Sequence, residues 1–370
     1  MTSTPLRDST THSRGGSLGG LDPWLALSSA CLILVGFMAI YSATAATGPH
    51  DVFKKQIVFF LVGLVPFAIL WRIPPQIWQR ASNALWLLNI GLLAVVLVKG
   101  QSAKGAQRWI DIGPMQFQPS EMSKLFCVIT LATFFYTRRN EIKKPSTLFM
   151  SFLHVGPSLA LIFKQPHLGA TAVVFCAWLV MAIVAGTPWK HLVVAGVCLG
   201  LLGGSLSLHG YQKDRLKGFV DKDTKGNSYQ THQAALAFGA GGVFGRGFLK
   251  GEQKNTVPER HNDFIFAVIG EEGGLVVCCL VVAGFLATYG RMWLTMAQTE
   301  DYWGRLALAG VITCLGFHTA VNIFMTLAIV PVVGLWLPFM SYGGTALWLC
   351  MAFLGLAHNV YRHDQDAMFS

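Results

Sequence analysis

Charged residues are scarce in this chain. Of its 370 residues only 12% are Asp, Glu, Lys or Arg, whereas 53% are hydrophobic and the mean hydropathy is +0.50. A soluble domain carries about a quarter charged residues, so an ordinary soluble enzyme is excluded. The apolar content is too high for a disordered or nucleic-acid-coating protein. In a membrane protein, 28 basic against 18 acidic residues indicate cytoplasmic anchors or an anionic ligand, and not nucleic acid.

Metal and nucleotide motifs are also missing. The eight cysteines lie inside apolar runs and none forms a CxxC pair, which is typical of apolar packing residues. There is no HExxH motif and no paired Cys/His spacing that would predict structural zinc. The glycine-rich stretch GAGGVFGRG (239–247) fits neither GxGxxG nor a Walker motif, so we expect a tight turn or a helix-packing segment there.

Ten long apolar runs predict an all-α, polytopic integral membrane protein. About 20 apolar residues cross a bilayer as a helix, and backbone in contact with lipid has to bond to itself. A long extracytoplasmic loop, 209–264, is expected between helices 7 and 8, within one transmembrane domain (22–360). Residues 1–21, expected to be flexible, and 361–370 would be cytoplasmic tails. The expected spans are 22–44, 53–71, 83–98, 119–136, 147–163, 169–187, 190–208, 265–290, 305–330 and 337–360.

The basic residues of the short connections predict the orientation. With the amino terminus inside, 12 Lys and Arg residues fall on the cytoplasmic side and 6 on the other side. Basic residues concentrate in cytoplasmic loops. Both termini are therefore expected in the cytoplasm, and the long loop is expected outside the inner membrane.

Ionisable groups at membrane depth are costly, so they are candidate functional residues. In QRWIDIGPMQFQPSEMSK (107–124), Pro119 suits the first turn of a helix, which places Glu121 and Lys124 on one side of it. Two interpretations remain open. The pair is either a local ion pair that neutralises itself, or part of a site in which Lys124 and the nearby Arg108 bind a phosphate group.

Asp263 lies in PERHNDFIFAVIGEEGG (258–274), where a polar loop meets an apolar helix. Spacing alone favours a helix cap, for which Asp is a preferred residue. The functional alternative is a partly desolvated carboxylate that acts as a base. A cation site formed by Glu259, His261 and Asp263 has no established ligand spacing in its favour.

A third candidate segment is LPFMSYGGTALW (337–348). Pro338 and the glycine pair that follows loosen the entry to a helix, and Ser341 offers a hydroxyl there. All three segments lie toward the outer face. Together they predict one site with a candidate base, candidate cations and access from the lipid, which suits an ionic substrate with a lipid tail.

The same segments resemble a known family. GAQRWIDIG, QFQPSEMSK, QPHLG (165–169), PERHNDFIFAVIGEEGG and LPFMSYGGT occur in this order and are similar to the SEDS family (shape, elongation, division, sporulation), which includes RodA, FtsW and SpoVE. GAQRW and SYGGT are most like RodA. The resemblance implies ten membrane helices and a peptidoglycan glycosyltransferase that polymerises lipid II and releases undecaprenyl diphosphate. It also implies a class B penicillin-binding protein as partner, in wall elongation and cell shape.

The resemblance also implies site residues. The family's essential aspartate matches Asp263, its PSExxK glutamate and lysine match Glu121 and Lys124, and its GA-x-RW arginine matches Arg108. We therefore expect Asp263 to be the catalytic base. Arg108, Glu121, Lys124 and Ser341 are expected to bind substrate, and a divalent cation, Mg²⁺ or Mn²⁺, is the one cofactor considered.

Two positions depart from the family pattern. His167 stands where the family usually has Asp (QPDLG), which puts any role of an acidic group there in doubt, and Asn262 replaces a common Thr. Two rival functions also remain open: a lipid II flippase, which predicts a site near mid-membrane, and a non-catalytic scaffold. The clustering of candidates at one face favours the enzyme.

Overall fold

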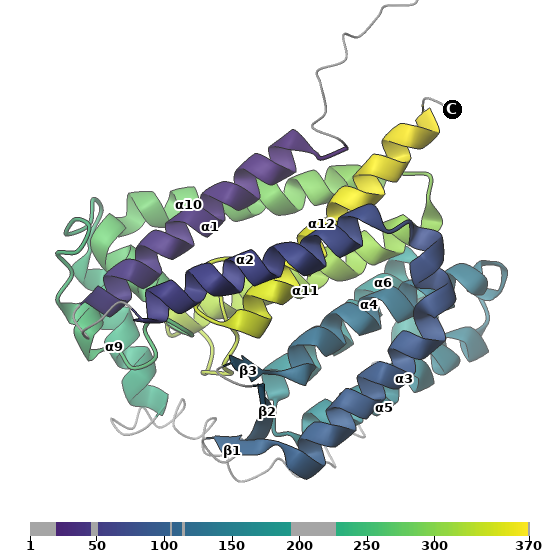
Figure 1. The fold of residues 1–370 in the computed structure, drawn as a ribbon, viewed down its shortest axis with the longest axis horizontal. Helices are drawn as coiled ribbons and strands as arrows, with labels where there is room; N and C mark the ends of the chain where they lie inside the picture. The colour runs from purple at the N-terminus through teal and green to yellow at the C-terminus, as the bar shows by residue number, and fades with distance from the viewer. Residues whose placement is uncertain (1–19, 46–50, 104–105, 113–114, 194–226, 369–370) are drawn as a thin grey trace, which may run out of the picture.

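The computed structural model describes residues 20–45, 51–103, 106–112, 115–193 and 227–368, and this part is built almost entirely of helices (Figure 1). The helices are α1 (Pro23–Thr44), α2 (Asp51–Arg72), α3 (Pro75–Lys99), α4 (Pro119–Thr137), α5 (Pro145–Lys164), α6 (Leu168–Val184), α9 (Asn227–Ala240), α10 (Ile265–Gln298), α11 (Tyr302–Thr326) and α12 (Gly344–Met368). Two 3-10 turns are η2 (Arg139–Glu141) and η3 (Gln253–Thr256).

Seven of the described helices are long and apolar enough to cross a membrane, and α6 is a shorter apolar helix of 17 residues. The predicted all-α, multi-pass membrane architecture is therefore confirmed. Nine of the ten predicted spans coincide with a described helix. The span predicted at 190–208 lies outside the described residues from residue 194 onward, so the count of ten stays a prediction.

Several helix boundaries differ from the expected spans, and α10 for example ends at Gln298 and not at 290. α3 begins at Pro75 and not at 83, because proline suits the first helical turn and the polar residues that follow continue the helix. The last span is helical only from Gly344, since 337–343 is irregular. α12 then continues to Met368, so residues 361–368 of the expected carboxyl-terminal tail extend this helix.

A small antiparallel sheet, which the sequence did not predict, leads into α4. Its strands β1 (Gln101–Ala103), β2 (Ala106–Ile112) and β3 (Met115–Phe117) pair in sequence order. The sheet and α9 lie toward the end of the bundle opposite the carboxyl terminus, here called the α9 end (Figure 1).

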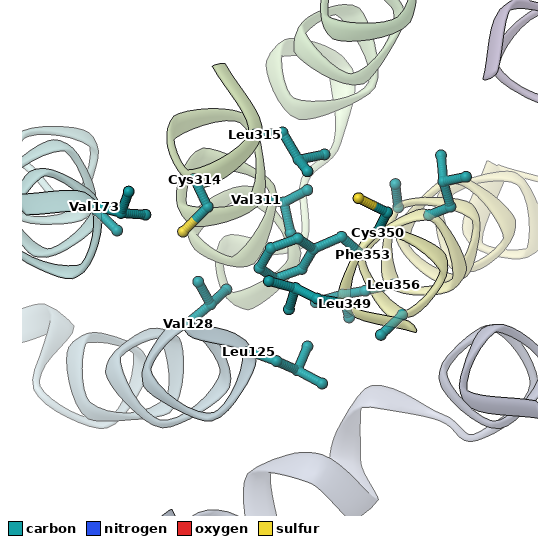
Figure 2. Packing of buried hydrophobic residues seen from close by; sticks show 14 of the residues in the cluster. Leu125, Val128, Val173, Val311, Cys314, Leu315, Leu349, Cys350, Phe353 and Leu356 are labelled. Carbon is teal, nitrogen blue, oxygen red and sulfur yellow. The ribbon is translucent and has the colours of Figure 1, made fainter. Parts of the chain in front are cut away.

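The core is centred on α12. Of its most apolar 18 residues 83% are buried, against 17% for α2, which packs along α12 but presents most of its surface outward. Side chains of α4, α6, α11 and α12 interlock in the core (Figure 2). Cys314 and Cys350 are buried there, which agrees with the prediction that cysteines in apolar runs are packing residues.

α10 is kinked at Gly274, where φ is +66° and ψ is −171°. The glycine-rich stretch packs against this kink, and the amide of Arg246 donates to the carbonyl oxygen of Glu271 at 2.9 Å. A β-carbon on Gly241 would lie 1.9 Å from the carbonyl oxygen of Gly270. Only glycine permits so close an approach of two backbones, and the predicted helix-packing role of the stretch is confirmed.

Candidate active site

Ser341 joins two segments that are far apart in the sequence. Its hydroxyl donates to the carbonyl oxygen of Asn262 at 2.6 Å and accepts from the amide of Leu337 at 2.8 Å. The amide of Tyr342 donates to the carbonyl oxygen of His261 at 2.8 Å. Ser341 is only 4% exposed. Its hydroxyl, which the sequence predicted to bind substrate, is used here to hold the segment before α10 against the segment before α12.

Gln56 of α2 fastens the same junction from the other side. Its amide nitrogen donates to the carbonyl oxygen of Ser341 at 3.3 Å, and its oxygen accepts from the amide of Gly343 at 3.2 Å. The Tyr342 ring lies 5.5 Å from the His261 ring.

Asp263 is half-buried and lies two residues before the first residue of α10. Its carbonyl oxygen accepts from Nδ2 of Asn322 on α11 at 2.8 Å. A β-carbon on Gly334 would lie 3.8 Å from Oδ2 of Asp263, so the carboxylate lies beside the segment that links α11 to α12. The N-cap position of α10 is Phe264. The helix-cap interpretation, which spacing alone favoured, is therefore wrong.

Glu121 and Lys124 form an ion pair inside the protein. Pro119 begins α4 as predicted, and Nζ of Lys124 lies 2.8 Å and 2.7 Å from the two carboxylate oxygens of Glu121. Lys124 has no exposed surface and Glu121 has 2%. The indole N–H of Trp336 donates to Oε2 of Glu121 at 2.9 Å.

Lys124 uses its whole donor capacity within this cluster. An ammonium group has three N–H donors. Two reach Glu121, and Nε2 of His318 lies 2.8 Å from Nζ. In this structure Lys124 therefore faces protein on every side, as the local ion-pair interpretation expects. A role of Lys124 in phosphate binding stays a prediction.

Arg108 lies on β2 and is half-buried. Its Nε donates to the carbonyl oxygen of Gln165 at 3.0 Å, and a terminal nitrogen donates to the carbonyl oxygen of Pro166. These two bonds attach the sheet to the turn between α5 and α6. Of the two predicted cations, Arg108 is partly exposed, whereas Lys124 is fully buried.

His167 explains how the chain tolerates its departure from the family pattern. It is the N-cap residue of α6, and its Nδ1 accepts from the amide of Ala170 at 3.0 Å. An Asp side chain is a preferred acceptor at this position. The neutral imidazole supplies the same kind of acceptor, so the local helix start does not need the carboxylate.

Lys254 anchors the loop before α10 by a second buried ion pair. Its ammonium contacts Oε1 of Glu272 and donates to the Ser42 hydroxyl at 2.6 Å. That hydroxyl in turn donates to Oε1 of Glu272 at 2.5 Å. Glu271 accepts from the amides of Gln253 at 2.7 Å and Lys254 at 2.5 Å. The two adjacent glutamates thus fix the loop to α1 and α10, and neither is aimed at an open site.

Arg260 fastens the same loop to the end of α1. Its Nε donates to the carbonyl oxygen of Ala43 at 2.6 Å, and Nη1 donates to that of Asn255 at 3.0 Å. Burial lowers the pKa of the Arg260 guanidinium, because removing it from water disfavours the charged form. The hydrogen bonds to carbonyl oxygens offset part of that cost.

The sequence did not single out several residues of these networks, among them Lys254, His318, Asn322 and Trp336. The signal for two of them was present, because His318 and Asn322 are polar residues four apart inside an apolar run and so share one face of α11. Their partners on other segments are set by the fold alone.

No cluster suited to a resident metal ion is present in the part of the chain that the structure describes, since no three His, Cys, Asp or Glu side chains are grouped closely enough. Glu259, which the sequence placed near Asp263, accepts at Oε2 from Nδ2 of Asn262 at 2.8 Å. A role for Mg²⁺ or Mn²⁺ stays a prediction, since this cation is commonly held by one or two carboxylates together with substrate phosphates.

Comparison with known proteins finds relatives that all belong to one family. The family model described as “Cell cycle protein”, for FtsW, RodA and SpoVE, matches residues 23–366. The chain is 33% identical over 358 residues to the peptidoglycan glycosyltransferase MrdB of Escherichia coli, covering 93% of this chain and 94% of MrdB. It is 32% identical over 356 residues to the probable peptidoglycan glycosyltransferase FtsW of Trichlorobacter lovleyi, covering 93% of each.

Solved structures agree. A chain from a structure described as “Structural coordination of polymerization and crosslinking by a peptidoglycan synthase complex” matches with a TM-score of 0.82 at 29% identity, covering 93% of this chain and 98% of that chain. The rod shape determining protein RodA of Thermus thermophilus matches with a TM-score of 0.69 at 28% identity, covering 93% and 97%.

Proposed function

The chain belongs to the FtsW, RodA and SpoVE family of cell cycle proteins and is a multi-pass membrane peptidoglycan glycosyltransferase, and on this basis we propose that it polymerises lipid II into glycan strands for cell wall elongation and cell shape. Undecaprenyl diphosphate would be the released product. The observation that carries the proposal is the carboxylate of Asp263, held beside Gly334 at the α9 end by contacts from α11 and from the segment before α12.

Asp263 would act as the general base. A sugar hydroxyl of lipid II is a weak nucleophile, and a positioned carboxylate that takes its proton contributes ~10²–10⁴-fold to the rate. The oxygen would then attack the anomeric carbon at the reducing end of the growing glycan, and the bond from that carbon to the diphosphate would break.

Arg108 would stabilise the negative charge that develops on the departing diphosphate. A planar guanidinium suits phosphate oxygens, and this side chain is only half-buried. Glu121, Lys124 and Ser341 would serve binding through the walls that they fix, since their polar atoms contact protein groups. A divalent cation would have to arrive with the diphosphate of the substrate.

The proposed partner and the proposed location rest on the same relatives. A class B penicillin-binding protein would crosslink the strands. The similar chain in the solved peptidoglycan synthase complex supports this proposal. We propose that the protein lies in the bacterial inner membrane with both termini in the cytoplasm and with the α9 end outside, supported by the 12 to 6 distribution of basic residues.

The test is polymerisation of labelled lipid II in detergent, with the class B partner present in every sample. Asp263→Asn is expected to abolish long glycan while protein level and lipid II binding persist. Asp111→Asn is the matched control, because Asp111 is an exposed carboxylate on β2 at the same end of the bundle, and it should polymerise normally. Long glycan from Asp263→Asn would refute the assignment of the base.

The same assay separates the enzyme from a lipid II flippase. Detergent removes the two compartments that a flippase needs, so only an enzyme makes product. A wild-type sample that binds lipid II and makes no glycan in detergent, with an active partner control, would favour transport.

A further inference from the structure

Asn322 is bonded through its side chain to the main chain of Asp263. Its Nδ2 donates to the carbonyl oxygen of Asp263 at 2.8 Å and to that of Leu335 at 2.7 Å, and its side chain has no exposed surface. An amide nitrogen has two donor hydrogens. Both are used on these two carbonyls, so one side chain of α11 joins the segment before α10 to the segment before α12.

The Leu335 side of this bridge is fixed independently. The next carbonyl, that of Trp336, lies 3.3 Å from Nδ1 of His318, one turn before Asn322 on α11. Because a carbonyl only accepts, Nδ1 carries the proton and Nε2 accepts from Lys124 at 2.8 Å. The Trp336 ring also lies 4.1 Å from the His318 ring.

The carboxylate of Asp263 lies against this fixed segment. A β-carbon on Gly334, the residue before Leu335, would lie 3.8 Å from Oδ2. Gly334 has φ +71°, a conformation that favours glycine. The two hydrogen bonds of Asn322 therefore contribute directly to the distance between the carboxylate and this segment, beside the bonds of Ser341 and Tyr342 to the residues before Asp263.

We propose that Asn322 is a positioning residue for Asp263. It does so by tying the main chain of Asp263 to a segment that His318, Lys124 and Trp336 hold rigid. The inference rests on the proposed function, in which Asp263 takes the proton from the acceptor hydroxyl. Asn322 itself moves no proton and contacts Asp263 only at the main-chain oxygen.

Asn322→Ala removes both donors. We expect kcat for lipid II polymerisation to fall ~10–100-fold, because a displacement of about 1 Å at the reacting groups has an effect of that size. KM should change less than about twofold, since an interaction used only in the transition state is lost. The acid limb of the kcat–pH profile should move to lower pH, because a carboxylate with more access to water ionises more easily.

Asn359 offers a matched control. It is fully buried on α12, and its Nδ2 donates to the carbonyl oxygens of Trp71 at 3.0 Å and Ile73 at 2.8 Å, near the opposite end of the bundle. Asn359→Ala removes the same two bonds far from Asp263. It is expected to lower Tm as Asn322→Ala does, while kcat and the pH profile of the folded enzyme stay those of the wild type.

The outcomes are distinguishable. Wild-type kcat and pH profile in Asn322→Ala, or an equal loss of kcat in Asn359→Ala, would overturn the positioning role. If Asn322→Ala does not fold, Asn322→Ser, which keeps one donor, is measured in its place and should show a kcat between wild type and Asp263→Asn; wild-type kcat there would also overturn the role. An active Asp263→Asn instead rejects the proposed base, whatever Asn322 does.

Discussion

At the scale of single residues, the central feature is a closed set of contacts around a buried charge pair. Lys124 donates to Glu121 and to His318, His318 donates to the Trp336 carbonyl, and the Trp336 indole returns to Glu121. Taking two ions out of water costs several kcal/mol each, and attraction offsets this only when the remaining donors and acceptors are also satisfied. Here the two aromatic partners satisfy them.

Lys124→Met should destabilise the protein by about 3–5 kcal/mol, because it leaves the Glu121 carboxylate buried and unpaired. The measurement is thermal unfolding of the purified protein in detergent. Adding Glu121→Gln to the same chain should recover much of the loss, since no buried charge remains. An unchanged Tm in Lys124→Met would show that Glu121 is not charged in the folded protein.

Lys144 provides the control for that experiment. It pairs with Glu141 at the same spacing of three residues and at 2.6 Å, but the two side chains are 61% and 52% exposed. The Lys144 ammonium lowers the pKa of the Glu141 carboxyl through a side-chain hydrogen bond. Water replaces this partner readily, so Lys144→Met is expected to leave Tm unchanged.

At the scale of elements, α10 is bent at Gly274, and another segment supplies hydrogen-bond partners beside the bend. Beside Gly274, the amides of Leu275 and Val276 donate to the carbonyl oxygens of Gly242 at 3.0 Å and Val243 at 3.1 Å. A kink in a helix leaves such groups without their usual partners. The glycine-rich stretch after α9 satisfies them, so the kink and the loop between α9 and α10 form one unit.

Gly241→Ala is expected to destabilise this unit by about 1–3 kcal/mol, the usual cost of overpacking, because the new β-carbon would lie 1.9 Å from the Gly270 carbonyl oxygen. Gly239→Ala, two residues earlier in α9, meets nothing within 4 Å. It should be neutral or stabilising by up to ~1 kcal/mol, since Ala is the better helix former. Tm of both variants is the measurement, and equal values would contradict the packing role.

At the scale of the whole molecule, contacts place the ends of the helices. The amide of Asp22, before α1, donates to Nδ1 of His358 on α12 at 3.0 Å, so both termini of the bundle lie at one end. The Tyr302 hydroxyl, at the start of α11, donates to the Ala185 carbonyl oxygen, just after α6, at 2.9 Å. α9, the next described helix, lies at the other end (Figure 1). Residues 194–226, between these two helices, lie outside the part of the chain that the structure describes.

The proposed orientation predicts opposite labelling of two exposed positions. In a background without reactive thiols, a cysteine introduced at Asn255, in the outer loop, should react with a membrane-impermeant maleimide in intact spheroplasts. A cysteine introduced at Lys144, between α4 and α5, should react only after lysis. Both positions are exposed in the structure, so burial does not decide the result. Reversed labelling would overturn the orientation.

The sequence by itself determined the class of the molecule and the location of its helices. Apolar runs long enough to cross a bilayer form helices whatever their neighbours, because lipid offers the backbone no hydrogen bonds. The start of α4 at Pro119 and the packing role of the glycine-rich stretch followed from local chemistry. The motifs around Asp263 and Glu121 were likewise enough to indicate the family.

The tertiary structure alone decided which polar groups meet. Trp336 bonds to Glu121, Ser341 to Asn262 and Lys254 to Ser42, although the two partners of each pair are far apart in the sequence. Local propensity does not encode such pairings, because the partners belong to different helices and loops. For the same reason the spacing around Asp263 suggested a helix cap, whereas the fold puts Phe264 at that position. Long-range contacts override a local preference worth about 1 kcal/mol.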